Sequence, residues 1–326
     1  MRLKLVPQDT RIDFLAPWRY AVGGSFVAII LSVLLVAIVG LNFGIDFRGG
    51  TTIRTEAEQS VDVAAYRDAI APLNLGDVAI TEVFDPAFGD DRNVAMVRVQ
   101  AQEGQESVSP EVIDSIAAAM QEVDPTLRVQ SVESVGPKVS GELIQAAIVS
   151  VVLALVAVLF YIWIRFEWQF SLGAVAAITH DVILTLGIFS LLQIRFDLAI
   201  IAALLTIVGY SLNDTVVVYD RVRENLIKYK KRPLREVLNL SVNETLSRTV
   251  MTSVTTLLAL ISLFVLGGDV IRGFVFAMIW GVIIGTYSSI YVAAAVLLFL
   301  GTKRDWSKAE SDTAGTQFAK GAKRES

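Results

Sequence analysis

The sequence predicts a polytopic α-helical membrane protein with six transmembrane helices and an α+β domain between the first and second of them. Two observations predict this class. Apolar residues (AVILMFWYC) make up 54% of the 326-residue chain and the mean hydropathy is +0.57, whereas ordinary soluble domains reach only about 45–50% apolar even with glycine counted. Six stretches are also apolar enough, over the roughly 20 residues that a bilayer requires, to be spans.

The spans divide the chain into segments of very unequal length. We expect spans at residues 20–41, 143–164, 168–194, 198–219, 249–268 and 273–301, and outside them an N-terminal segment (1–19), a domain (42–142), a basic loop (220–248) and a tail (302–326). The first span follows a basic segment, as a signal peptide does, but it is longer than a normal h-region and lacks a cleavage site. A retained membrane anchor is therefore expected.

Charge predicts the orientation. Lys and Arg collect before the first span, between the fourth and fifth, and after the sixth, which places both termini in the cytoplasm. Residues 42–142 carry 7 basic and 18 acidic residues, so this domain is expected on the periplasmic side of a bacterial inner membrane. Its acidity also argues against nucleic-acid binding.

The domain is expected to be ferredoxin-like, because its predicted elements follow one another as strand, helix, strand, strand, helix, strand. Residues 51–57, 78–84, 93–100 and 127–135 have strand character, and residues 61–73 and 110–123 have helical character. Residues 85–90 are expected to form a turn. This fold alone assigns no function, and we interpret the domain as a lever or docking module.

Composition excludes most enzyme classes. The chain has no Cys and a single His, which removes thiol nucleophiles, disulfides and multi-His metal sites. It lacks the glycine-rich motifs that cradle phosphates, and it has no Ser–His pair or second mid-membrane His at the spacing that an intramembrane protease would require. We expect no enzymatic activity and no cofactor other than protons as a coupling ion.

The fourth span contains an acidic residue deep in an apolar run. Asp214 shares a helix face with Tyr210 and Ser211, and Asn213 precedes it. An ionisable group in hydrocarbon costs at least about 2.5–3.5 kcal/mol, so such residues are usually functional. The fifth span opens with Arg248, on the same side of the membrane, followed by several hydroxyl residues.

Two interpretations of this pair remain open. If Arg248 approaches and leaves Asp214 as helices move, the carboxyl releases and binds a proton, which makes a proton relay. Alternatively, the two form a static ion pair that fixes helix register, or Arg248 extends to the interface. Asp181 and His180, in the third span, are either further relay residues or a hydrogen-bonded packing pair. The small residues of 281–289 are interpreted as a close-packing face.

Several motifs together resemble the SecD/SecF family of bacterial protein-export membrane subunits, within the RND superfamily. The most specific covers residues 209–225, and the first contains Gly44, Asp46, Gly49 and Gly50. The motifs are FGIDFRGGT (43–51), VGPKV (135–139), HD (180–181), GYSLNDTVVVYDRVREN (209–225), ETLSRT (244–249) and GTYSSIY (285–291). Their order and spacing extend over nearly the whole chain.

The resemblance implies an RND-type six-span subunit that pairs with SecD and associates with the SecYEG channel. It implies that the proton-motive force helps to draw a preprotein out on the periplasmic side, with Asp214 and Arg248 on the proton path and Asp181 as a weaker third. Two other functions stay open: a stand-alone RND-type exporter of lipid or small molecules, for which the domain offers little room for a substrate cleft, and a scaffold whose charges only lock helices together.

Overall fold

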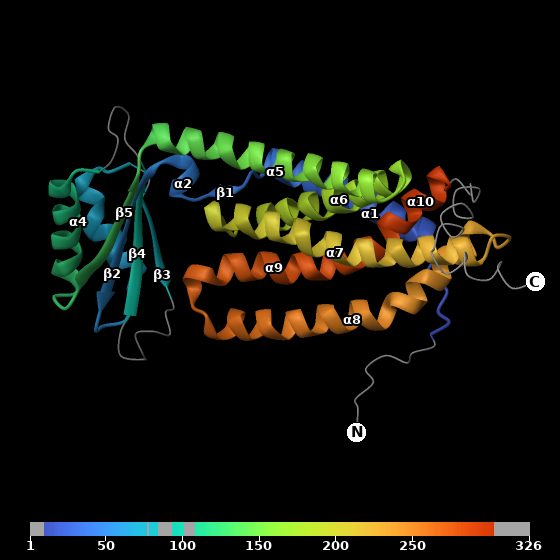
Figure 1. The fold of residues 1–326 in the computed structure, drawn as a ribbon. Coiled ribbons are helices and arrows are strands. Elements are labelled where there is room, and N and C mark those ends of the chain that lie inside the picture. The colour runs from blue at the N-terminus through green and yellow to red at the C-terminus, as the bar shows by residue number, and fades with distance from the viewer. Residues whose placement is uncertain (1–9, 77, 84–92, 101–107, 303–326) are drawn as a thin grey trace, which may run out of the picture.

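The computed structural model describes residues 10–76, 78–83, 93–100 and 108–302. Figure 1 shows a long bundle of helices with a small sheet domain at one end. The predicted turn at 85–90, the first nine residues and the predicted tail from residue 303 onward lie outside the described residues.

Within the described residues, six helices are long and apolar enough to cross a membrane, which agrees with the six predicted spans. Five are continuous, and the sixth contains a π-helical segment, η3. The bounds are α1 (Trp18–Ile38), α5 (Pro137–Arg165), α6 (Trp168–Leu192), α7 (Leu198–Lys228), α8 (Leu234–Leu266), and α9 (Asp269–Ser288) continued by η3 (Ser289–Ala293) and α10 (Ala294–Leu300).

The bundle has central and outer helices. Of the most apolar 18-residue stretch of each helix, half is buried in α6 and in the sixth helix, but only 11% is buried in α1, α5 and α8. Helices α1, α5 and α8 therefore turn large apolar faces outward, as lipid-facing helices do. Small residues let the central helices approach closely. A side chain at Gly281 on α9 would collide with Ile207 on α7, which agrees with the packing face predicted at 281–289.

The segment 220–248 is not the loop that its charges suggest. α7 continues to Lys228 and α8 begins at Leu234, so only residues 229–233 lie outside these two helices. The helices persist because apolar side chains keep helical spacing beneath the charged ones. The buried members of this seam are Val222, Leu226, Val237, Leu238 and Val242.

The sheet domain has the predicted sequence of elements. Its four strands are antiparallel, in the order β3-β4-β2-β5. The elements are β2 (Gly50–Ala57), α3 (Val63–Ile70), the 3-10 helix η1 (Ala71–Leu73), β3 (Val78–Val83), β4 (Asn93–Gln100), α4 (Pro110–Val123) and β5 (Arg128–Val135). Helix α4 packs with α3 on the side of the sheet that faces away from the bundle (Figure 1). Ile53, Val97 and Ile116 are fully buried between these layers.

A short connection, not predicted from the sequence, joins the domain to the bundle. Strand β1 (Asn42–Phe43) follows α1 and pairs in parallel with β6 (Arg195–Phe196), between α6 and α7. The one-turn helix α2 (Ile45–Arg48) then leads into β2. Three phenylalanine rings, from Phe43, Phe47 and Phe196, lie 5.7–5.9 Å apart around this pairing. The domain is therefore fixed to the start of α7 as well as to the end of α1.

Candidate functional site

The buried carboxyl of α7 is the centre of the site. Asp214 is 9% exposed, and its Oδ1 atom accepts a hydrogen bond of 2.5 Å from the hydroxyl of Thr249 on α8. Its Oδ2 atom is buried and has no hydrogen-bond partner among the described residues. A buried oxygen without a donor costs free energy, so the hydrogen bonding of this carboxyl is incomplete.

The structure brings Thr249, rather than its neighbour Arg248, onto Asp214. The side chain of Arg248 is exposed, and within the described part of the chain it forms no ion pair with Asp214. Asn213, predicted to support the site, is exposed as well. Tyr210 does point toward α8, where its hydroxyl donates to Thr256 at 3.4 Å.

A second buried carboxyl joins three helices. Asp181 on α6 is completely buried. Its Oδ1 atom lies 2.9 Å from Nδ1 of His180, and its Oδ2 atom accepts hydrogen bonds from the hydroxyls of Ser211 on α7, at 2.7 Å, and Ser288 on α9, at 2.8 Å. The ring of His180 stacks on Tyr287. Ser211 therefore serves Asp181 and not Asp214, on whose face the sequence placed it.

Several hydroxyl groups of the site were not assigned to it from the sequence. Thr215, next to Asp214, shares a hydrogen bond of 3.0 Å with Ser289 of η3, and Ser253 of α8 shares one of 2.7 Å with Thr286 of α9. Ser288 and Ser289 fall in the segment interpreted only as a packing face. Their signal in the sequence is a run of hydroxyl residues at 286–289 inside an apolar span.

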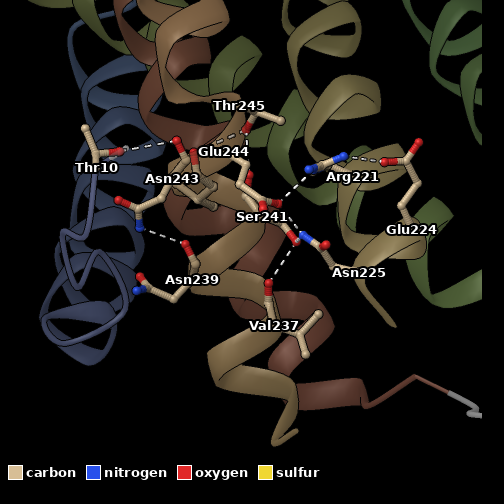
Figure 2. A network of polar contacts seen from close by, with 11 residues as sticks. Thr10, Arg221, Glu224, Asn225, Val237, Asn239, Ser241, Asn243, Glu244 and Thr245 are labelled. Atoms are coloured by element: carbon tan, nitrogen blue, oxygen red, sulfur yellow. Dashed lines mark hydrogen bonds and ion pairs between the residues drawn. The ribbon is translucent and has the colours of Figure 1, made fainter. Parts of the chain in front are cut away.

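One helical turn before Arg248, a polar network ties α8 to α7 at the end of the bundle remote from the sheet (Figure 2). Glu244 accepts hydrogen bonds from Arg221, at 2.7 Å, and from Asn225, at 2.5 Å. On the other side of α8, Asn243 accepts a 2.9 Å bond from the backbone of Ile12. The start of α8 is thus held between α7 and the segment that precedes α1.

The motif with two adjacent glycines lies at the domain connection. Gly49 and Gly50 have φ angles of +73° and +132°, a region that side chains disfavour, and they turn the chain from α2 into β2. Asp46 of α2 accepts a 3.0 Å hydrogen bond through Oδ2 from the backbone N–H of Leu198, the first residue of α7. Gly44 donates its N–H to the carbonyl of Phe196 at 2.8 Å.

The same connection contains a partly buried acid–base cluster. Asp197 lies 3.8 Å from Arg195. Burial raises the pKa of the Asp197 carboxyl above its ordinary value; the negative charge of Asp46 acts in the same direction and Arg195 opposes both. Burial, with the positive charges of Arg195 and Arg48, lowers the pKa of Arg98 on β4. Charges of the domain and of the bundle are therefore electrostatically coupled here.

Among the described residues, no group of three or more His, Cys, Asp or Glu side chains is placed to hold a metal ion. The arrangement instead presents two buried carboxyls, Asp214 and Asp181, that accept hydrogen bonds from hydroxyl groups of neighbouring helices.

The fold and site define a multi-pass membrane protein with ionisable groups buried inside its helical bundle. Residues 115–303 match the sequence model described as protein export membrane protein SecD/SecF, C-terminal, and residues 35–61 match the SecD/SecF GG motif. The chain belongs to the SecD/SecF family of protein-export membrane proteins.

Individual relatives are similar over nearly the full length. The chain is 60% identical over 320 residues to protein translocase subunit SecF of Cereibacter sphaeroides and 58% identical over 328 residues to that of Rhodobacter capsulatus, with 98% of each chain covered in both cases. It superposes on crystallographic SecDF, a translocon-associated membrane protein from Thermus thermophilus, with a TM-score of 0.79 at 36% identity. That match covers 91% of this chain but 39% of the SecDF chain.

Proposed function

We propose that this chain works with a SecD partner at the SecYEG channel and uses the proton-motive force to promote preprotein translocation and release on the periplasmic side of the inner membrane. Support comes from the relatives, which are translocase subunits, and from SecDF, in which a chain like this one forms part of a larger translocon-associated protein. On this proposal a complete pump needs a second polypeptide.

The observation that carries the proposal is the half-satisfied carboxyl of Asp214. A buried polar atom without a partner is destabilising, and an ionisable group inside an apolar bundle is costly to retain, which favours a functional role for this carboxyl. Oδ1 of Asp214 is paired with Thr249, and Oδ2 is buried and unpaired within the described residues. The free oxygen is where a proton would bind.

Arg248 supplies the switch in this proposal. It adjoins Thr249, which already touches Asp214, so a rotation of α8 that exchanges the two would bring a cation onto the carboxyl. An approaching cation favours the charged carboxylate, and its withdrawal favours the protonated acid. Asp181, one further carboxyl of the interior, is proposed as a third residue on the path.

The two ends of the bundle support the proposed orientation. The sheet domain, proposed to be periplasmic, lies opposite the basic turn between α7 and α8, proposed to be cytoplasmic together with both termini (Figure 1). One charge that crosses 100 mV releases about 2.3 kcal/mol. Several protons per cycle would therefore suffice to shift a two-state equilibrium of the domain.

The direct test is Asp214→Asn, which preserves shape but removes the titrating group. In proton-energised vesicles that contain SecYEG, the SecD partner and this chain, we expect the variant to lose the part of preprotein export that depends on the proton gradient. The part driven by ATP alone should stay intact. Export at the wild-type rate would overturn the relay assignment, and Asn213→Ala, at an exposed neighbour, is the matched control.

The partner is tested separately by isolating the tagged chain from native membranes in mild detergent. Recovery with a SecD-like polypeptide and channel subunits is expected. Recovery as a homo-oligomer without either would instead support a stand-alone exporter.

A further inference from the structure

Two consecutive serines in the sixth helix point to different carboxyls. Ser288 ends α9 and Ser289 begins η3, and both are completely buried. Neighbouring residues on a helix point about 100° apart, so one serine meets α6 and the other meets α7. The hydroxyl of Ser288 donates to Asp181 at 2.8 Å.

The second serine lies beside Asp214. The hydroxyl of Ser289 is 3.0 Å from that of Thr215, the next residue after Asp214, and it also lies near the Asp214 carboxyl itself. That carboxyl keeps one buried oxygen, Oδ2, without a hydrogen-bond partner in the described chain. A rotation of the Ser289 hydroxyl toward Oδ2 would supply the missing donor.

One backbone atom links the two serines. The carbonyl oxygen of Gly285 accepts from Ser288 at 3.1 Å and from Ser289 at 2.9 Å. The hydroxyl oxygens of Ser288 and Ser289 are therefore separated by no more than the sum of these two distances. One water molecule can bridge such a separation. Because a serine has a single hydroxyl hydrogen, Ser288 can donate either to Gly285 or to Asp181, and both serine hydroxyls lie within hydrogen-bond distance of the same carbonyl.

The π-helical segment that begins at Ser289 is consistent with a functional site, since π-helical turns are frequent at such positions. Close packing keeps the serines in place: a Cβ atom at Gly285 would lie 3.2 Å from Cβ of Ser211, and Ser211 itself donates to Asp181 at 2.7 Å. The sixth helix thus cannot move away from α7 without breaking the contact between Ser289 and Thr215.

From these contacts we propose that Ser288 and Ser289 form a hydroxyl bridge that carries a proton between Asp214 and Asp181. The proton of the Asp214 carboxylic acid binds the oxygen of Ser289 as the hydrogen of Ser289 passes on to Ser288, directly or through one water. The hydrogen of Ser288 then binds the carboxylate of Asp181. Asp214 loses one proton, Asp181 gains one, and both serines end unchanged.

The bridge rests on the proposed proton-driven function and deepens it by naming the groups between the two carboxyls. The test measures proton flux, with a pH-sensitive dye, in proteoliposomes that contain this chain and its SecD partner. We expect Ser288→Ala and Ser289→Ala each to lower the flux about tenfold or more. The double variant should be little worse than either single one, because residues that act as one unit are not additive.

Hydroxyl rescue and a matched control separate conduction from packing. Ser288→Thr and Ser289→Thr retain the hydroxyl and should restore most of the flux. Ser262→Ala, which removes an exposed hydroxyl that donates to the carbonyl of Leu258 in its own helix at 2.9 Å, should change nothing. Thermal unfolding and co-purification with the partner identify any variant that fails to fold. In that case Thr215→Val, which removes the hydroxyl that positions Ser289, should lower the flux, and wild-type flux in the folded variant would count against the bridge.

The outcomes separate this proposal from the one it rests on. If Asp214→Asn stops proton flux while folded Ser288→Ala and Ser289→Ala conduct at the wild-type rate, the bridge is wrong and the relay at Asp214 stands. If the alanine variants fail but folded threonine variants do not recover, the hydroxyl is not the conducting group and the bridge is wrong. If Asp214→Asn conducts normally, the proposed function itself fails.

Discussion

Asp214 and Asp181 lie in the same bundle but differ in how their oxygens are satisfied. Asp181 accepts from His180, Ser211 and Ser288 on three helices, whereas Asp214 has one short hydrogen bond, from Thr249, and the Ser289 hydroxyl nearby. A carboxyl with three partners is held rigidly, and one with a single partner can exchange it at little cost. On the proposed function, Asp214 is therefore the group whose surroundings would change during a cycle.

This contrast predicts the effect of Thr249→Val, which keeps the shape of the side chain but removes the donor to Asp214. Both oxygens of the carboxyl would then be unpaired, and we expect a loss of about 1–3 kcal/mol of stability, measured as a lower midpoint of thermal unfolding. Thr255→Val is the control, because the exposed hydroxyl of Thr255 bonds only to backbone carbonyls of its own helix. Equal midpoints for the two variants would contradict the assigned contact.

Asp197 gives a pH-dependent prediction outside the membrane-spanning helices. Because burial raises its pKa above 3.8, the folded chain binds more protons than the unfolded chain between 3.8 and the raised value. Stability must then fall as the pH rises through this window. We expect Asp197→Asn to flatten that decline.

The measurement is the unfolding midpoint from about pH 4 to about pH 8. The control is Glu58→Gln, a change at an exposed carboxyl that directly follows β2. Asp197→Asn should gain stability relative to the wild type as the pH rises, whereas Glu58→Gln should not. A constant difference across the range would show that Asp197 does not titrate in the window.

At the scale of elements, α7 connects the domain to the buried carboxyl without interruption. It begins at Leu198, whose N–H is capped by Asp46, and Asp214 lies about 24 Å further along the same helix by helical rise. No proline interrupts it. A displacement of Asp214 would therefore be transmitted along the uninterrupted helix α7 to Leu198, which is bonded to Asp46 at the domain connection.

Asp46→Ala tests this connection. Loss of a helix cap costs about 0.5–2 kcal/mol, and here it should also weaken the link between proton flux and export, so that export falls more than flux does. Asp62→Ala is the matched control, since Asp62 caps α3 within the same domain through two 3.0 Å bonds but does not touch the bundle. If both variants export equally well, the cap at Asp46 plays no part in coupling.

The sequence predicts some elements well and others not at all, for physical reasons. The six long helices and Asp214 stand out because hydropathy is a local property and a charge interrupts it visibly. Strands β1 and β6 are two residues long and show no periodicity, so their pairing becomes evident only when distant segments meet. Thr249, and not Arg248, contacts Asp214, because the contact depends on the rotation of α8 about its axis. The boundaries of a span do not fix this rotation.

At the scale of the whole molecule, the bundle has two chemically distinct ends. The acidic sheet domain occupies one, and the other contains the turn at residues 229–233 and the network around Glu244 (Figures 1 and 2). A membrane with basic segments retained on its cytoplasmic side would orient such a molecule in one direction. The buried carboxyls then lie between two compartments of different proton concentration.

The absence of cysteine from the sequence makes this orientation directly measurable. We expect Lys231→Cys, at an exposed position of the α7–α8 turn, to react with a membrane-impermeant maleimide in inverted inner-membrane vesicles. Glu58→Cys, exposed on the sheet domain, should react in those vesicles only after detergent is added, and should react freely in right-side-out vesicles. The reverse pattern would place the domain in the cytoplasm, and protons that enter from the periplasm would then reach Asp214 from the end of the bundle that holds Glu244.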